Sequence, residues 1–599
     1  MKGSRGYVRW EWNLDRIGSW IAGVGALMVV ALTCFISTAG ASAAPLVENA
    51  RAVTGGFDPS RIYQSPNIAV DPANPNTVAL VVGNYHYPGG CYLYVSQDGG
   101  RSWGAPASLL PAGTQFCGDR PIAGRLEAPV FASNGTLYVG FSGAPGGQQF
   151  PNTPSSAFFT RSSDLGLTTP TATVSATHMV SSGKMGSGGG MMGSGGGMGA
   201  NSSSGSGMTQ ARGFSVAVDP SNPNTVYMGW LLTTTTPSGF KGSISPTFSV
   251  LGNEQSLVSV SHDGGRTWSM PVNLTTAYGH PTIPSGGGSE TPQLLAARGG
   301  TVYAITDTAA ASGAMGMSAV NKLVMYKSTN GGRTWQASLI PFSVPHGYQS
   351  IFEPQAAIDS NTGEIYVAFN TQAGKPGSGV GANSVYVLHS SDGGRTWSAP
   401  ANVVDPAARY VYDQYDPGIS VAPNGRVSVA WIDFRSDPYY RLGPSGNPAS
   451  GSSSGERYYD IYAAYSTDHG ATWSKNLRVS DQTIDASLGA EFPDYAVLPV
   501  GIASTNSKMY VAWGNPVAGA PPATPEDSYF TAIDFSPIGA VATTSSTSSG
   551  TKAAWAVIGA GIAFALAGLI LVFTRRREIR RPSVPEPEKE TVGSGAPFD

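Results

Sequence analysis

Short apolar runs with a strand-like pattern, each followed by a turn rich in Gly, Ser and Asp, fill the body of the chain. Examples are residues 92–95 (Tyr-Leu-Tyr-Val) and 385–388 (Val-Tyr-Val-Leu). Such runs between turn residues are typical of antiparallel hairpins. The two long apolar stretches, 17–38 and 553–573, lie near the ends of the chain. The pattern therefore predicts an all-β fold for everything between them.

One turn motif recurs throughout this region, with the pattern Ser-x-Asp-x-Gly-x-Ser/Thr-Trp. Its Asp or Asn accepts backbone N–H bonds, its Gly supplies a positive φ, and its hydroxyl closes the loop. A decayed copy at 162–168 lacks the Trp, and five copies keep it. We expect these five to be structural, through Asp98 and Trp103, Asp263 and Trp268, Asn330 and Trp335, Asp392 and Trp397, and Asp468 and Trp473. Where no insertion intervenes, successive Trp residues lie roughly 60 to 75 residues apart, which suits one four-stranded sheet per repeat.

These turns resemble the Asp-box (BNR) repeats of the sialidase superfamily, in its non-viral members, across most of residues 67–480. The resemblance implies a β-propeller of four-stranded blades, with the Asp boxes on outer turns away from the central pocket. Innermost strands can be placed at 68–70, 130–132, 215–218, 293–296, 355–358, 418–421 and 495–498. We therefore expect seven blades, with six, the number in known sialidases, as the alternative. Residues 45–54 would supply the outer strand that the last blade lacks and so close the ring.

The two ends of the chain predict where the propeller is held. Residues 1–43 combine a net-basic start, an apolar run and Ala41-Ser42-Ala43, as in an export signal; because the run is long, an uncleaved signal anchor is the alternative. Residues 553–574 could cross a membrane as one helix, and the Arg-rich residues that follow would stay in the cytoplasm. We expect an extracellular propeller at 44–540, a Ser/Thr-rich stalk at 541–552 and a cytoplasmic tail at 575–599. The protein would then be a single-pass protein of the cell membrane.

Composition and short motifs exclude several classes of partner and site. Only 12% of residues are charged and the net charge is −3, so the chain lacks the basic charge that a nucleic-acid partner would require. Zinc-spaced His pairs, Walker loops and dinucleotide fingerprints are absent from the sequence. Cys91 and Cys117, the two cysteines beyond the leader, predict a disulfide staple, with reactive thiols as the alternative. The Gly/Ser/Met-rich insertion 181–208 predicts a flexible connection, with a thioether site for Cu(I) as the alternative.

Acidic residues recur just before the innermost strands, where a propeller brings its blades together at one face of the central channel. They are Glu127, Glu290, Glu353, Asp416 and Glu491. Each could simply hydrogen-bond to neighbouring strand N–H groups. Alternatively the five form an acidic ring whose mutual repulsion raises carboxyl pKa values or recruits Ca²⁺. We expect that no cofactor is required, with Ca²⁺ as the candidate at this ring, and no metal ligands are assigned.

The resemblance also implies which residue types a sialidase site would need. These are three arginines for the substrate carboxylate, a Tyr nucleophile paired with Glu, and an Asp acid/base. The catalytic candidates are Asp119, Arg120, Glu353, Tyr412, Asp413 and Arg435. The Arg-Ile-Pro sequence that opens the first blade in the family is Arg61-Ile62-Tyr63 here, which is a partial match. If the chain is an enzyme, the resemblance implies a retaining exo-α-sialidase-type glycoside hydrolase.

Two functional hypotheses follow from these features. The first is a membrane-anchored, sialidase-like propeller that acts on or binds glycans. The second is a non-catalytic surface binding or adhesion propeller with an acidic, Ca²⁺-binding central face. In both, the partner is a glycan or a cell-surface protein, and fold alone does not choose between them.

Overall fold

The computed structural model describes the strands of the propeller and many of the turns between them. The described residues are 44–54, 63–84, 90–110, 114–117, 127–145, 156–164, 174–175, 208–235, 255–274, 291–307, 322–344, 352–372, 382–440, 457–488, 500–517 and 526–535. Residues Pro45–Ser536 form one compact unit. The predicted leader, stalk, membrane span and tail lie outside the described residues. In the part that is described, no helix has the length and apolar character to span a membrane.

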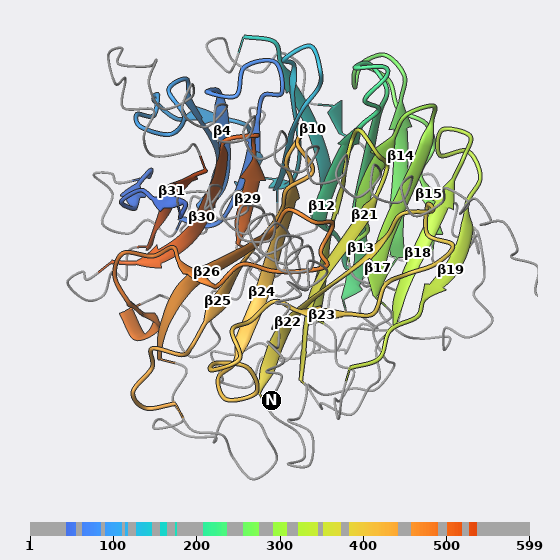
Figure 1. Cartoon of the computed structure of the whole chain (residues 1–599). Helices are drawn as coiled ribbons and strands as arrows, with labels where there is room; N and C mark the ends of the chain where they lie inside the picture. The colour runs from blue at the N-terminus through green and yellow to red at the C-terminus, as the bar shows by residue number, and fades with distance from the viewer. Residues whose placement is uncertain are drawn as a thin grey trace, which may run out of the picture. The chain divides into compact units, whose positions relative to one another are not determined.

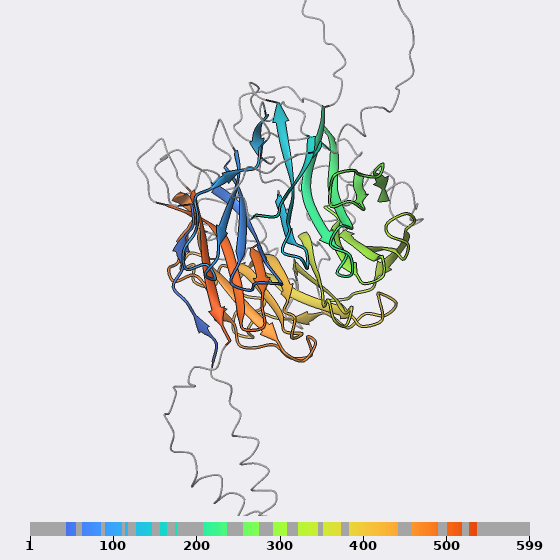
Figure 2. The same ribbon diagram turned by 90° about the horizontal axis from the view of Figure 1, so that it is seen from above.

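The described strands form seven antiparallel sheets arranged around a ring, so the predicted all-β propeller of seven blades is confirmed (Figures 1 and 2). The first three blades comprise β3 (Tyr63–Val70), β4 (Val78–Asn84), β5 (Gly90–Ser96) and β6 (Ala107–Ser108); β7 (Thr114–Cys117), β8 (Glu127–Phe131), β9 (Leu137–Pro145), β10 (Ser156–Ser162) and β11 (Val174–Ser175); and β12 (Met208–Val218), β13 (Val226–Thr235), β14 (Gln255–Ser261) and β15 (Val272–Asn273). Met208, predicted to end the insertion, is thus the first residue of β12.

The remaining four blades follow the same order from the innermost strand outward. They comprise β16 (Gln293–Ala297), β17 (Thr301–Asp307), β18 (Leu323–Ser328) and β19 (Gln336–Ile340); β20 (Phe352–Ile358), β21 (Ile365–Gln372), β22 (Asn383–Ser390) and β23 (Ala401–Asn402); β24 (Gln414–Val421), β25 (Val427–Asp433), β26 (Tyr458–Ser466), β27 (Leu477–Arg478) and β28 (Ile484–Asp485); and β29 (Gly501–Ser504), β30 (Lys508–Pro516) and β31 (Glu526–Asp534). The innermost described strand of blade 7 is β29, beyond the predicted segment 495–498, which lies outside the described residues.

The two ends of the propeller meet in blade 7, as the sequence predicted. The N-terminal strands β1 (Leu46–Val47) and β2 (Arg51–Ala52) both pair with β31, with Leu46 opposite Asp534 and Arg51 opposite Phe530. In Figure 2 the blue N-terminal strands accordingly lie beside the orange-red strands of blade 7. Pairing with the N-terminal strands covers the outer edge of β31, which would otherwise be open to another chain.

Packing between blades explains why many strands read as continuous apolar runs. Every residue of β4 and of β25, the second strands of blades 1 and 6, is buried. A blade lies between two others, so both faces of its middle strands are covered and the period of two is lost. Each innermost strand contacts that of the next blade, and β29 contacts β3, which closes the ring.

The Asp boxes have the local structure that their sequence predicts. In the first box the Ser96 hydroxyl donates to Asp98 Oδ1 at 2.8 Å, and the backbone N–H of Gly100 donates to Ser96 Oγ at 2.7 Å. Ser102 donates to Asp98 through both its hydroxyl (2.6 Å) and its backbone N–H (2.9 Å). These bonds from Ser102, chiefly the hydroxyl, lower the pKa of Asp98 from 3.8 to about 2.

The second glycine of the box fixes the turn against the preceding blade. In the third blade Gly265 has a φ of 84°, and a Cβ added to it would collide with the ring of Phe159 in blade 2. Trp268 of the same box packs edge-on against Phe159, with ring centroids 4.7 Å apart. The Trp therefore anchors the turn, and the glycine allows the turn to lie directly on an aromatic ring.

Replacing Asp98 by Asn should keep the fold and reduce the loss of folding stability at low pH. A carboxyl whose pKa is lowered by folding stabilises the folded state above about pH 4, and that contribution is lost as the pH falls toward about 2. Asn does not titrate, and Asn330 already accepts from Ser328 at 2.9 Å and pairs with Thr334 in its own box. Denaturant titrations across this pH range should give the variant a smaller loss of unfolding free energy than the wild type. Equal losses would contradict the assignment.

Two glycine substitutions should separate backbone strain from close packing. Gly265 and Gly299 both have positive φ, but a Cβ at Gly299 has no atom within 4 Å. Gly299→Ala should therefore cost only the left-handed backbone, about 1 kcal/mol. Gly265→Ala adds the collision with Phe159 and should cost about 3 kcal/mol or more. Unfolding free energies of the two variants measure the difference, and similar costs would show that the box does not depend on this contact.

Candidate functional site

Of the five acids in the predicted ring, the structure describes the side chain of one, Asp416. Asp416 lies in β24 with a φ of 51° and is buried. Its backbone N–H donates to Asn370 Oδ1 of blade 5 at 3.3 Å, and its carbonyl accepts from Val500 at the start of blade 7 at 3.3 Å. The residue therefore ties the inner strand of blade 6 to both neighbouring blades. Glu290 and Glu491 lie outside the described residues, and Glu127 and Glu353 are described only as backbone of β8 and β20.

The register of the inner strands shifts at the same level in several blades, a feature that the sequence patterns did not predict. In β24 the shift falls between Tyr415 and Gly418, and in β20 between Phe352 and Gln355. Each of these irregular segments contains a proline, which cannot donate to the ladder. The Glu-Pro and Asp-Pro pairs therefore mark bulges on the inner strands as well as candidate acids.

Asp413, one of the catalytic candidates, is completely buried just before β24. Its Oδ1 accepts from the backbone N–H and the side-chain amide of Asn383, at 2.5 and 2.9 Å, and its Oδ2 accepts from the Tyr440 hydroxyl at 2.5 Å. The backbone carbonyl of Asp413 also accepts from the N–H of Phe434 at 3.1 Å. The carboxylate thus joins blade 5 to the loop that follows β25.

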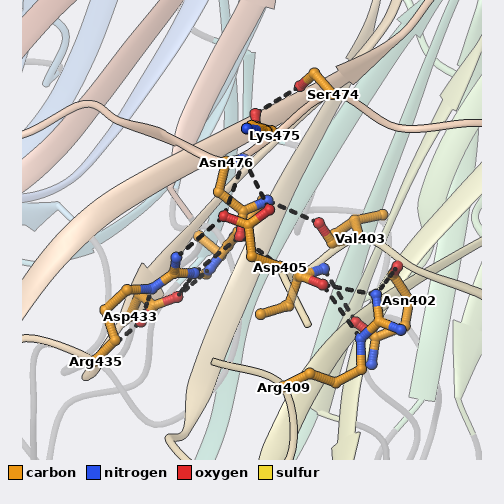
Figure 3. A network of polar contacts seen from close by, with 11 residues as sticks. Asn402, Val403, Asp405, Arg409, Asp433, Arg435, Ser474, Lys475 and Asn476 are labelled. Carbon is orange, nitrogen blue, oxygen red and sulfur yellow. Dashed lines mark hydrogen bonds and ion pairs between the residues drawn. The ribbon is translucent and has the colours of Figure 1, made fainter. Parts of the chain in front are cut away.

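Arg435, at the start of that loop, is held along its whole guanidinium (Figure 3). Its Nε and Nη2 donate to the two carboxylate oxygens of Asp433 at 2.9 and 2.6 Å, and Nη2 also donates to Asn476 Oδ1 at 2.9 Å. Asp405 lies 3.6 Å from Nη1, and the guanidinium carbon is 3.9 Å from the ring centre of Tyr462. Its side chain is only 16% exposed. These contacts link blades 5 and 6.

The other catalytic candidates differ in how far the structure describes them. Tyr412 is half-buried, with its ring 5.4 Å from that of Tyr440. Asp119 and Arg120 lie outside the described residues, and the side chain of Glu353 is not described. The catalytic assignment of all six therefore stays a prediction.

The predicted disulfide also involves a residue that is described only in part. Cys91 is disulfide-bonded and completely buried. Its Sγ lies 4.0 Å from the carbonyl oxygen of Ser142 in β9, and β7 places the backbone of Cys117 opposite the next residue, Gly143. The pairing of Cys91 with Cys117 stays the prediction.

A pair of tyrosines, one exposed and one half-buried, lies at the end of blade 6 that carries Arg435, and the pair was not predicted from the sequence. Tyr439, after β25, and Tyr458, the first residue of β26, lie with ring centroids 6.1 Å apart. Arg457 lies over the Tyr458 ring and is paired with Asp485 of β28. We call these four residues the tyrosine platform. The sequence signal is the repetition of Tyr-Tyr at 439–440 and 458–459, on either side of one loop.

Metal ligands do not gather in the described residues. No group of three or more His, Cys, Asp or Glu side chains among them is placed to hold a metal ion. The buried carboxylates of blade 6 instead accept hydrogen bonds from protein donors, as Asp460 does from Arg478 at 2.7 Å and from Ser480 at 3.1 Å. At this end of blade 6, the described acids therefore hold loops in place.

Comparison with known proteins identifies the repeat. A family model described as BNR/Asp-box repeat matches residues 464–475, which contain the box of Asp468 and Trp473. No curated protein matches the chain. Seven blades and this repeat make the chain an Asp-box repeat β-propeller protein.

Several solved structures are similar at low identity. They include a protein of unknown function from Dyadobacter fermentans DSM 18053 (12% identity, 82% of this chain, 99% of that chain, TM-score 0.40), the Hadza microbial sialidase Hz136 (14%, 77%, 74%, 0.38) and a PL25 polysaccharide lyase, an ulvan lyase (12%, 80%, 94%, 0.40). Similarities this distant say nothing about the substrate or the chemistry of this chain.

Tyr440→Phe should destabilise the protein. The change removes the hydroxyl that donates to the buried Oδ2 of Asp413, and a buried acceptor that loses its donor costs about 1–3 kcal/mol. Tyr439→Phe, at the neighbouring exposed position, is the matched control and should change the unfolding free energy by less than about 0.5 kcal/mol. Denaturant titration of both variants measures the effect. Equal stability of the two would mean that the bond to Asp413 does not support the fold.

Proposed function

We propose that this protein is a cell-surface propeller that binds glycans without hydrolysing them. The observation that carries the proposal is the engagement of Asp413 and Arg435 by protein partners. A general acid must reach the glycosidic oxygen, and an arginine that grips a substrate carboxylate must present free N–H groups. Asp413 is completely buried and accepts from Asn383 and Tyr440, while Arg435 is bidentate to Asp433 and its side chain is largely buried.

Binding at the same end of blade 6 is supported by what remains exposed there. Tyr439 is 57% exposed, and Tyr458 and Arg457 lie beside it. Exposed apolar side chains that gather in one place are typical of interaction sites. The export signal and the C-terminal apolar segment of the sequence would hold such a site outside the cell, at a membrane. Ca²⁺ at the acidic ring is a further part of the proposal.

A turnover assay paired with a binding assay tests the proposal. Purified full-length protein in detergent should release no fluorogenic aglycone from a terminal sialoside at acidic or neutral pH, with or without Ca²⁺, under conditions in which an active sialidase does. The same sample should bind immobilised glycans. Turnover that is lost in a folded Tyr412→Phe or Arg435→Ala variant would overturn the proposal and establish a glycosidase.

A further inference from the structure

We propose that the tyrosine platform of blade 6 is a binding site for the ring of a neutral sugar. This inference rests on the proposed function and names the place and the ligand class. The platform lies at the end of β26 opposite its Asp box, because β26 begins at Tyr458 and leads into the box at Ser466. It is therefore separate from the turns that pack the blades together.

Blade 6 carries more exposed large apolar side chains than any other described blade. The described residues include five large apolar side chains that are exposed, and three of them flank strands of blade 6: Val411, Tyr439 and Leu488. Val411 lies just before β24, Tyr439 follows β25, and Leu488 follows β28. Solvent-exposed apolar groups of this size cost free energy, so their concentration in one blade points to a ligand that covers them.

One buried carboxylate fixes the two tyrosines. Asp437 Oδ1 accepts from the N–H of Tyr439 at 2.7 Å, and its Oδ2 accepts from the N–H groups of Arg457 and Tyr458 at 2.7 and 2.9 Å. Both ends of the loop are thus tied to a single side chain that is almost fully buried. A surface that is already ordered loses little conformational entropy when a ligand binds.

The edge of the platform carries polar groups that are also held in place. Arg457 Nε and Nη2 donate to the two oxygens of Asp485 at 3.0 and 2.8 Å, and the guanidinium lies 4.9 Å from the ring centre of Tyr458. Asp485 in turn accepts from the backbone N–H of Ser487 at 3.0 Å. An aromatic face beside fixed donors and acceptors is the arrangement that orients a small amphipathic ligand.

A sugar ring has the complementary chemistry. Its C–H groups can lie on the exposed ring of Tyr439, and its hydroxyls can exchange hydrogen bonds with Arg457 and Asp485 at the edge of the platform. The charge of Arg457 is already balanced by Asp485, and the buried Asp437, which accepts from the backbone N–H of Arg457, adds a negative charge. A carboxylate on the sugar would therefore gain little attraction here, and the platform should prefer neutral sugars to acidic ones.

The test compares binding of matched glycans to full-length protein and its variants. The probes are immobilised neutral oligosaccharides ending in galactose, glucose or mannose, together with sialylated counterparts of those ending in galactose. Tyr439→Ala should weaken binding to the neutral probes about tenfold, whereas Tyr439→Phe should stay within about twofold because the ring face is retained. Met270→Ala, at a 64% exposed position two residues after an Asp box of blade 3, is the surface control and should bind normally. Thermal unfolding checks that each variant is folded.

A second variant tests the charge argument independently. Asp485→Asn leaves the charge of Arg457 without its partner, so the ratio of sialylated to neutral binding should rise by about threefold or more.

Three results would overturn the inference. If Tyr439→Ala binds neutral probes as well as the wild type does, the tyrosine platform is not the sugar site, and the proposed function still stands. Stronger binding of sialylated than of neutral probes by the wild type would remove the neutral-sugar assignment. Absence of binding to every glycan would overturn the proposed function itself, and the inference with it.

Discussion

The contact between each Asp box and the blade before it is the constraint on which the ring depends. The second glycine of a box lies on an apolar side chain of the preceding blade: Gly265 on Phe159, Gly394 on Met325 and Gly100 on Phe530. The last of these joins blade 1 to blade 7, where β31 also pairs with the N-terminal strands. Since the boxes are all at one end of the strands, packing of the ring at that end leaves the loops at the other end free to differ between blades.

In blade 6, buried carboxylates organise the loops at the end opposite the Asp box. Its loops are held by buried carboxylates, each with protein donors: Asp413 with Tyr440, Asp433 with Arg435, and Asp437 with the backbone of Tyr458. Unpaired, such groups would be costly in the interior, and paired they fix loop geometry. Bonds of this kind engage Asp413 and Arg435, and the bonds of Asp437 hold Tyr439 and Tyr458 together.

The sequence predicted the parts of the fold that local turn chemistry and repetition determine. Each Asp box is contained within eight residues, and the assignment of residues 45–54 to the outer strand of the last blade predicted how the ring closes. The location of β29 was missed, since no Asp box marks blade 7.

The candidate site was less predictable, because its contacts join distant parts of the chain. Asp413 meets Asn383 and Tyr440, and Arg435 meets Asn476. Residue type alone indicated an acid and an arginine near the pocket; only the fold shows that both are engaged. The platform was missed for the same reason, since Asp437 brings Tyr439 and Tyr458 together across a loop.

Hydrogen–deuterium exchange of the full-length protein, with and without a saturating neutral oligosaccharide, tests the central claim most directly. The account predicts slower exchange at residues 437–440, 457–458 and 484–488, with the Asp boxes unchanged. Protection confined to the starts of the inner strands, such as residues 413–418, would place the ligand in the central channel and contradict it.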